Sequence, residues 1–278
     1  MRVLPHADGF SAAIEGVDLT RELPPEAILA IREAWLAHRV VYFPRQPMAL
    51  ADLERLTMQM GGFGVDPYVE SLPGHPHVLE IRREPDEKAS VFGAAWHSDS
   101  TFLSRPPSAT LLFGKIVPPA GGETWFADEY AAYDALPAPR QKELEALTGI
   151  HSARMPYSPG GFYANEPGER SIRIRPLPSA NETTEHPVVR THPETGRKAL
   201  FVNPVYTIGI KGWEQEESGA LIAELTRHAT REEFLYRHRW SADMLAIWDN
   251  RCVMHLATGG YQGHKRLMYR TTVAGSRP

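Results

Sequence analysis

The stretch Trp96-His97-Ser98-Asp99-Ser100-Thr101-Phe102 carries an imidazole and a carboxylate two residues apart. In an extended strand, side chains at positions i and i+2 lie on one face, so we expect His97 and Asp99 to converge. They would supply two ligands of the two-histidine, one-carboxylate set that binds non-haem Fe(II) and leaves positions open. Such a pair also occurs as an ordinary His–Asp hydrogen bond on a surface strand, so the prediction depends on a third ligand elsewhere.

A third candidate ligand, His255, ends the stretch Trp248-Asp249-Asn250-Arg251-Cys252-Val253-Met254-His255. Asp249-Asn250 is a turn signal between two apolar runs, which predicts a hairpin with His255 on its second strand. We therefore expect His97, Asp99 and His255 to form one metal site. The alternative for His255 is a buried histidine that donates to a backbone carbonyl.

The composition is that of a globular protein with a sizeable core. The chain has 278 residues, 42% hydrophobic and 23% charged, with a formal net charge of −4. Without a basic run, we expect neither a nucleic-acid partner nor an anionic membrane surface. No apolar run has the length of a membrane span, and the first residues lack the apolar core of a signal peptide. Cys252 is the single cysteine, which favours a reducing, cytoplasmic compartment.

Periodicity predicts many short strands and a few helices, hence a mainly β fold with helices (α+β), a β-sandwich or jelly roll in one domain over residues 1–278. Residues 155–186 are rich in Pro, Gly and Asn and show little periodicity, so they are expected to form an active-site lid or a disordered loop. Helices are expected from Pro24-Pro25 through Trp35, and at 53–60, 127–136, 140–147 and 214–227. Strands are expected within 9–19 and at 40–43, 78–82, 108–117, 123–126, 200–203, 234–240, 244–248, 253–256 and 267–274.

Two arginines, Arg266 and Arg270, share one face of the last predicted strand. On a half-exposed strand both would face water. Alternatively they point into a cleft and bind anions, since guanidinium binds carboxylates in a bidentate manner. Four residues along a strand span about 13 Å, so the two arginines would serve two different anions in one elongated cavity.

These motifs, together with Gly121-Gly122-Glu123-Thr124, resemble those of the taurine/α-ketoglutarate dioxygenase (TauD/TfdA) family over about residues 9–275. The resemblance implies a double-stranded β-helix (jelly-roll) core flanked by helices. It implies Fe(II), 2-oxoglutarate as cosubstrate and O2. By position, His97, Asp99 and His255 match the iron ligands, whereas Thr124 and Arg266 match the clamp on the distal carboxylate of 2-oxoglutarate.

The resemblance also bears on the primary substrate, a small anionic molecule. Arg270 matches a residue that faces the anionic group of the substrate in several members, and the aromatic side chains Tyr68, Phe92 and Tyr206 are candidate cavity walls. Asp66 stands where taurine enzymes have a histidine, and Gly93 aligns near an asparagine of theirs. Taurine is therefore not the expected substrate. We expect a carboxylate- or sulfate-bearing molecule that is larger or less polar.

The implied reaction converts 2-oxoglutarate to succinate and CO2 while the substrate is oxidised. Related halogenases lack the carboxylate ligand, so Asp99 favours hydroxylation, although desaturation or ring closure stays open. The alternatives outside this class are a metal-dependent hydrolase and a non-catalytic jelly-roll metal-binding protein. Family resemblance also makes a dimer or tetramer plausible. The remaining histidines in Pro- or Gly-rich turns are expected to be exposed and non-functional: His75, His77, His151 and His264.

Overall fold

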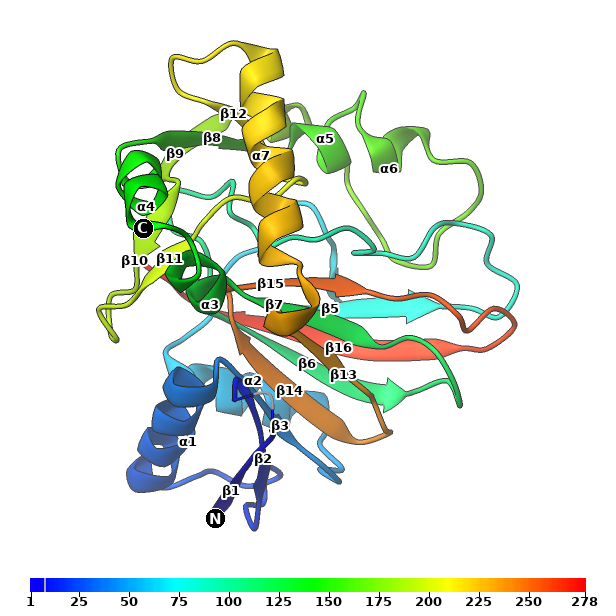
Figure 1. The fold of residues 1–278 in the computed structure, drawn as a ribbon. Coiled ribbons are helices and arrows are strands. Elements are labelled where there is room, and N and C mark those ends of the chain that lie inside the picture. Colours follow the sequence, from blue (N-terminus) through cyan, green and yellow to red (C-terminus); the bar gives the residue numbers. More distant parts are fainter. Residues whose placement is uncertain (8) are drawn as a thin grey trace.

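The structure, a computed structural model, describes residues 1–7 and 9–278, and its largest element is an eight-stranded sheet (Figure 1). The strand order is β1-β2-β3-β14-β6-β16-β5-β4, which places strands from both ends of the chain beside one another. Neighbouring strands in this order run antiparallel, except that β2 and β3 run parallel. The strands are β1 (Arg2–Pro5), β2 (Ser11–Glu15), β3 (Val40–Phe43), β4 (Ser71–Leu72), β5 (His75–Arg83), β6 (Ala109–Ile116), β14 (Met244–Asp249) and β16 (Arg266–Val273).

Three smaller sheets complete the β structure. A three-stranded sheet has the order β13-β7-β15, another has the order β12-β8-β9, and β10 pairs with β11. Their strands are β7 (Thr124–Asp128), β13 (Leu235–His238), β15 (Val253–Ala257), β8 (Thr148–Ser152), β9 (Thr183–Pro187), β12 (Thr207–Ile210), β10 (Val189–Thr191) and β11 (Lys198–Leu200). The β13-β7-β15 sheet matters most for function because β7 begins with Thr124 and β15 contains His255, which are both predicted site residues.

The central strands of the large sheet, β3, β14 and β6, are buried on both faces. On one face, Val41 and Ile247 pack with apolar side chains of α1 (Pro25–His38) and α2 (Leu50–Met60). On the other face, Trp248 and Met268 pack with Phe126 of β7, so the β13-β7-β15 sheet covers this side. Strands buried on both faces read as continuous apolar runs, which explains the uninterrupted stretches in the sequence.

The helices follow from local signals. Helix α1 has a proline in its first turn, where the missing N–H costs nothing, and it buries Ile31 and Trp35. Helix α2 ends at Gly61, whose φ of 141° suits glycine. The other helices are α3 (Glu129–Asp134), α4 (Ala138–Glu145), α5 (Arg154–Tyr157), α6 (Phe162–Asn165), α7 (Gln215–Ala229) and the 3-10 turns η1 (Pro178–Asn181) and η2 (Glu232–Phe234).

The hairpin predicted at Asp249-Asn250 is wrong. Strand β14 pairs with β3 and β6 in the large sheet, whereas β15 pairs with β7 in the small one. The turn therefore carries the chain from one sheet to the other across the core. A turn signal fixes where the chain bends and leaves open which strand each arm pairs with, so the sequence pattern fitted both arrangements.

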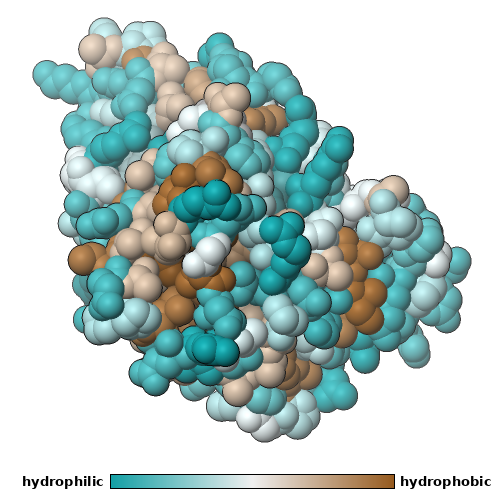
Figure 2. Space-filling model, turned by 90° about the horizontal axis from the view of Figure 1, so that it is seen from below, coloured by the Kyte–Doolittle hydropathy of each residue, from teal (hydrophilic) through white to brown (hydrophobic). Residues whose placement is uncertain are grey.

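Residues 155–186 are less irregular than predicted, since they contain α6, η1 and parts of α5 and β9. Among the residues that the structure describes, no helix is both long and apolar enough to cross a bilayer. Figure 2 shows, on the face seen from below, hydrophobic side chains in separate patches bordered by hydrophilic ones. Scattered apolar patches of this kind are ordinary on protein surfaces and identify no particular partner.

Candidate active site

The three predicted metal ligands meet between the large sheet and the β13-β7-β15 sheet. His97 is not in a strand as predicted: it forms one isolated β-bridge with His255 of β15, with reciprocal backbone hydrogen bonds of 3.0 and 2.8 Å. The bridge holds the two imidazoles side by side, with ring centroids 4.2 Å apart. Asp99 follows in a turn, and Ser100 has a left-handed φ of 51°. The turn begins at Asp99, and its carboxylate lies beside the imidazoles as the i, i+2 spacing predicts.

The geometry of this cluster fits a metal ion. Nε2 of His97 lies 3.7 Å from Oδ1 of Asp99, and Nε2 of His255 lies 3.9 Å from Oδ2. These distances are too long for hydrogen bonds. Ligand atoms bound at about 2.0–2.2 Å to one ion stand about 3–3.6 Å apart, so these atoms need to approach by less than about 1 Å to share an ion. One ligand atom from each of the three buried residues lies within 4.8 Å of the other two.

The protonation states also fit metal binding. Nδ1 of His97 lies 2.7 Å from the carbonyl of Ala95, which makes Nδ1–H the donor and leaves a lone pair on Nε2. Burial lowers the pKa of His97, and it lowers the pKa of His255 to about 3, so both imidazoles are neutral. Burial opposes ionisation of Asp99, but the nearby Arg270 guanidinium and the hydrogen bond from the Thr110 hydroxyl lower its pKa, to about 2.

A chain of hydrogen bonds, not anticipated from the sequence, holds Asp99. The Thr110 hydroxyl on β6 donates to Oδ2 of Asp99 at 2.6 Å and accepts from the Asn250 amide at 2.8 Å. The Trp248 indole N–H in turn donates to the Asn250 carbonyl oxygen at 3.0 Å. The turn between β14 and β15 is thus tied to the carboxylate ligand as well as to His255.

A second group of predicted residues lines a small cavity beside the imidazoles. Thr124, at the start of β7, and Arg266, at the start of β16, line this cavity together with His97 and His255. Arg266 is buried, and no carboxylate of the described residues pairs with it. Burial therefore lowers the pKa of its guanidinium without a compensating charge. A buried cation without a carboxylate partner, facing a cavity, is chemically suited to bind an anion.

Gly121 and Gly122, the glycine pair of the Gly121-Gly122-Glu123-Thr124 motif, form the backbone turn that precedes Thr124. A side chain on Gly121 would place Cβ 2.6 Å from the backbone of Gly260, so the two loops touch directly. Gly121 and Gly122 both have positive φ, at 71° and 67°. The turn delivers the chain into β7, and it places Thr124 opposite Arg266.

Arg270 lies on the same buried face of β16 as Arg266, as predicted. Its surroundings are different. One Nη donates to Oδ2 of Asp66 at 2.5 Å, and the other lies 3.4 Å from Oδ1 of Asp99. The two carboxylates raise its pKa although burial alone would lower it. Arg270 therefore connects the candidate metal ligand to Asp66.

Aromatic side chains form the wall of the cavity in front of the imidazoles. Phe92 and Tyr206 line it, as do Tyr157 and Tyr163, which the sequence analysis did not single out. Tyr68 does not reach the cavity: it stacks behind Tyr157, with ring centroids 5.1 Å apart. The two additional tyrosines come from the segment 155–186, where lack of periodicity gave no signal for them.

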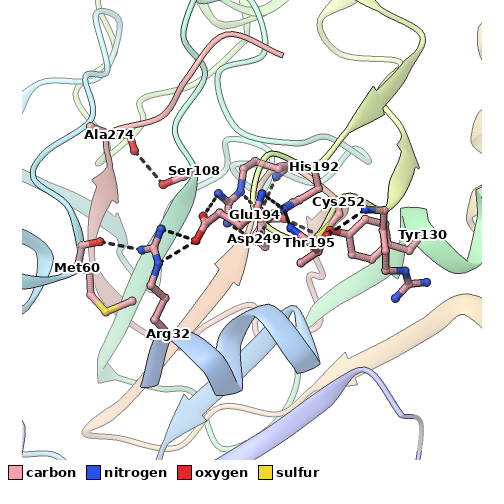
Figure 3. Close-up of polar contacts among 12 residues, drawn as sticks. Arg32, Met60, Ser108, Tyr130, His192, Glu194, Thr195, Asp249, Cys252 and Ala274 are labelled. Atoms are coloured by element: carbon pink, nitrogen blue, oxygen red, sulfur yellow. Dashed lines mark hydrogen bonds and ion pairs between the residues drawn. The ribbon is translucent and has the colours of Figure 1, made fainter. Parts of the chain in front are cut away.

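A second buried group, His192, Asp249 and Cys252, also has ligand atoms within 4.8 Å of one another. Figure 3 shows that its polar atoms are already engaged. Nδ1 of His192 accepts two backbone N–H groups, so Nε2 carries the proton and donates to Asp249 at 3.1 Å. Arg251 also donates twice to this carboxylate. The group is an ion-pair network that fixes the turn before β15, and it has no free imidazole lone pair for a metal.

The other histidines are not part of the site. His75 pairs with Glu54 at 2.8 Å, and His77 stacks on Phe63 at 3.9 Å between ring centroids. The prediction that His151 is exposed is wrong, since it is fully buried and hydrogen-bonded to Thr101. The prediction rested on the turn-forming residues near His151 in the sequence, but His151 lies on β8, the central strand of a three-stranded sheet.

Comparison with known proteins agrees with this geometry. A sulfate ester dioxygenase of Pseudomonas putida, dependent on α-ketoglutarate (2-oxoglutarate), is 32% identical over 278 residues, 99% of this chain and 90% of the relative. The α-ketoglutarate-dependent 2,4-dichlorophenoxyacetate dioxygenase of Cupriavidus pinatubonensis is 33% identical, with 88% of each chain covered.

Solved structures are similar over the whole chain. A crystal structure of a putative α-ketoglutarate-dependent taurine dioxygenase from Burkholderia xenovorans is 35% identical, covers 100% of this chain and 90% of its own, and has a TM-score of 0.82. The family model described as taurine catabolism dioxygenase TauD, TfdA family, matches residues 2–272. This chain therefore belongs to the TauD/TfdA family.

Proposed function

We propose that this protein is an Fe(II)- and 2-oxoglutarate-dependent dioxygenase that hydroxylates a small anionic organic substrate and releases succinate and CO2. The observation that carries the proposal is one arrangement: three metal-ligand side chains within 4.8 Å of one another, beside the cavity of the unpaired Arg266. Family membership supports the use of 2-oxoglutarate and O2. The names of the relatives, which act on sulfate esters and on phenoxyacetates, support an anionic substrate other than taurine.

In this proposal His97, Asp99 and His255 bind the iron through two neutral imidazoles and one carboxylate. Bound iron supplies the activation of O2 and the oxidising chemistry. Arg266 and Thr124 bind the distal carboxylate of 2-oxoglutarate, because Arg266 brings a buried positive charge with no carboxylate of the described residues to neutralise it. Thr110 keeps the Asp99 carboxylate oriented.

The remaining residues bind the substrate and exclude water. Arg270 faces the anionic group of the substrate, while Phe92 and Tyr206 supply apolar walls. Tyr68 acts one layer behind, by supporting Tyr157. Excluding water around the iron strengthens each of these electrostatic contacts and protects the reacting centre.

We further propose that residues 1–278 form one dioxygenase domain whose two facing sheets are a double-stranded β-helix (jelly-roll) core. Residues 155–186 are its lid, since Tyr157 and Tyr163 of this segment line the cavity. Ligand binding should then protect this segment from proteolysis. A cytoplasmic location and a dimer or tetramer remain predictions from composition and family.

The unpaired arginine separates this proposal from its alternatives. A zinc hydrolase could use the same three ligands, and so could a metal-binding protein without turnover, but neither needs a buried, uncompensated Arg266. Succinate release from 2-oxoglutarate under aerobic conditions with Fe(II) tests the proposal. The panel of primary substrates comprises alkyl sulfates, sulfonates, aryloxyalkanoates and amino acids. Activity with zinc and without 2-oxoglutarate would contradict it.

A further inference from the structure

The carboxylate of Asp66 already forms an ion pair with the guanidinium of Arg270, the group that would bind the substrate anion. Its Oδ2 lies 2.5 Å from Nη2 of Arg270, and both side chains are about one-tenth exposed, at 10% and 9%. Its Oδ1 accepts the backbone N–H groups of Tyr68 at 3.1 Å and Val69 at 3.0 Å. The turn therefore holds the carboxylate aimed at Arg270.

The charges around Arg270 leave little attraction for another anion. The guanidinium contacts two carboxylates, but Asp99 is also a proposed metal ligand, so in the metal-loaded protein Asp66 is the carboxylate whose negative charge is left to pair with Arg270. A substrate anion that approached Arg270 while Asp66 stayed in place would meet that negative charge at short range, in a partly dehydrated site. Binding of the anion to Arg270 and the contact of Asp66 with Arg270 are therefore in competition.

The ion pair also stands between two cavities. Asp66 and Arg270 both line the cavity of about 50 Å³ in front of His97 and Asp99. The same two residues line an outer cavity of about 260 Å³, on whose wall Val69 and Arg175 also lie. The inner cavity is the smaller of the two. Separation of the pair would join it to the larger space, into which the Asp66 carboxylate can withdraw.

We propose that Asp66 is a specificity-determining residue, an internal anion that competes with the anionic group of the substrate for Arg270. This inference rests on the proposed function, because it assumes that Arg270 faces the substrate. Anions that make several strong hydrogen bonds to a guanidinium, such as sulfates and carboxylates, replace Asp66. Weakly hydrogen-bonding anions do not. The selection acts on substrate binding. Arg266 and Thr124, which are proposed to hold 2-oxoglutarate, take no part in it, whereas Arg270 also lies 3.4 Å from the proposed metal ligand Asp99.

The test measures anion binding to the protein loaded with Mn(II) and N-oxalylglycine, an unreactive analogue of 2-oxoglutarate. Phenoxyacetate, hexyl sulfate and hexanesulfonate are titrated by calorimetry into the wild-type protein and the Asp66→Asn variant. We expect at least one of these anions to bind Asp66→Asn about tenfold more tightly, because the competing charge is removed. If no anion binds the variant more tightly than the wild type, the inference is wrong.

A matched control distinguishes competition from a general charge effect. Glu70→Gln removes the same charge from the same segment, but Glu70 contacts the exposed Arg175 at 4.0 Å and not Arg270. We expect Glu70→Gln to leave the dissociation constants within about twofold of the wild type. An equal gain from Glu70→Gln would overturn the assignment of the effect to Asp66.

A double variant tests the dependence on Arg270 directly. In an Arg270→Gln background there is no guanidinium to compete for, so Asp66→Asn should no longer increase anion affinity. A gain that persists without Arg270 would contradict the competition. Should Arg270→Gln fail to fold, the comparison with Glu70→Gln decides the question by itself.

The proposed function can fail separately from this inference. Binding of N-oxalylglycine with Mn(II) is measured first, and its absence would overturn the 2-oxoglutarate assignment. The anions are therefore also titrated into the protein without Mn(II) and N-oxalylglycine. A gain of affinity in Asp66→Asn under those conditions would support the competition even if the cosubstrate assignment were wrong.

Discussion

Two arginines on strand β16 have almost the same burial, and their electrostatic surroundings are opposite. Arg266 and Arg270 are 5% and 8% exposed and lie on one face of the strand. No carboxylate of the described residues approaches Arg266, whereas Arg270 contacts both Asp66 and Asp99. The pKa of the first guanidinium is accordingly lowered by burial, and that of the second is raised.

In the proposed function, these surroundings are two ways to keep a cation ready for its ligand. The charge of Arg266 is left for a ligand, so the protein bears the cost of burying it until an anion binds. The charge of Arg270 is neutralised by the protein, so an anion must first replace a carboxylate. The first arrangement suits a cosubstrate that is always the same molecule. The second suits a position where one anion must be chosen among several.

The largest expected effect is on stability. Arg270→Met leaves Asp66 and Asp99 buried without their cation, and should lower the free energy of unfolding by about 3–5 kcal/mol. Arg266→Met removes an unpaired buried charge, and should leave the free energy of unfolding within about 1 kcal/mol of the wild type or raise it. Urea denaturation of the metal-free protein measures both. Equal destabilisation by the two substitutions would break the comparison.

The next effect concerns the cosubstrate. Arg266→Gln removes a charge-assisted contact worth about 1.5–3 kcal/mol, so the KM for 2-oxoglutarate should rise roughly 10- to 150-fold. The KM for the primary substrate should change far less, because Arg270 is intact. Steady-state succinate formation, with each concentration varied in turn, gives both constants. Equal rises in both would show that the two arginines have been assigned wrongly.

Threonines at the two ends of the site extend the comparison to the metal. Thr110→Val removes the hydroxyl that orients Asp99, and should weaken Mn(II) binding by about 10- to 100-fold. Thr124→Val is the matched control beside Arg266, and should affect 2-oxoglutarate binding while leaving the Mn(II) affinity unchanged. Mn(II) titration followed by electron paramagnetic resonance measures the affinity. If Thr124→Val weakened Mn(II) binding and Thr110→Val did not, the roles assigned to the two threonines would have to be exchanged.

The sequence predicts the elements of this fold better than their partners. The apolar runs that became β14 and β15 were located correctly, and the convergence of His97, Asp99 and His255 is confirmed. Pairing was missed because a turn signal is local. His97 and Asp99 converge as the i, i+2 spacing predicts, although His97 lies in an isolated β-bridge with His255 and Asp99 lies in a turn.

Residues whose role depends on contacts with distant parts of the chain have no recognisable pattern in the sequence around them. Thr110 lies in a strand buried on both faces, where a threonine among alanine and leucine looks like ordinary packing. Tyr157 lies in a segment without periodicity. Asp66 could be identified as a departure from taurine enzymes, but its contact with Arg270, 204 residues away, is fixed only by the tertiary structure.

The smallest expected effect concerns two buried neutral histidines. His238 on β13 is paired in register with Thr124, at the Arg266 end of the site, and His151 hydrogen-bonds to Thr101, two residues beyond Asp99. Burial lowers the pKa of each to about 3. The unfolded chain binds a proton near pH 6.5 and the folded chain does not. Stability is therefore lost as the pH falls from about 6.5 towards 3, by up to about 1.4 kcal/mol per pH unit for each histidine.

His238→Gln and His151→Gln should each reduce this dependence by one proton, and the double variant should reduce it by two, because the two sites are independent. Urea denaturation at a series of pH values between 5 and 7 gives the slope for each variant, and the slope matters more than the stability at any one pH. If one of the single variants left the slope unchanged, the histidine at that end of the site would not contribute to it. The histidines at the two ends would then not be equivalent, in contrast to their equal burial.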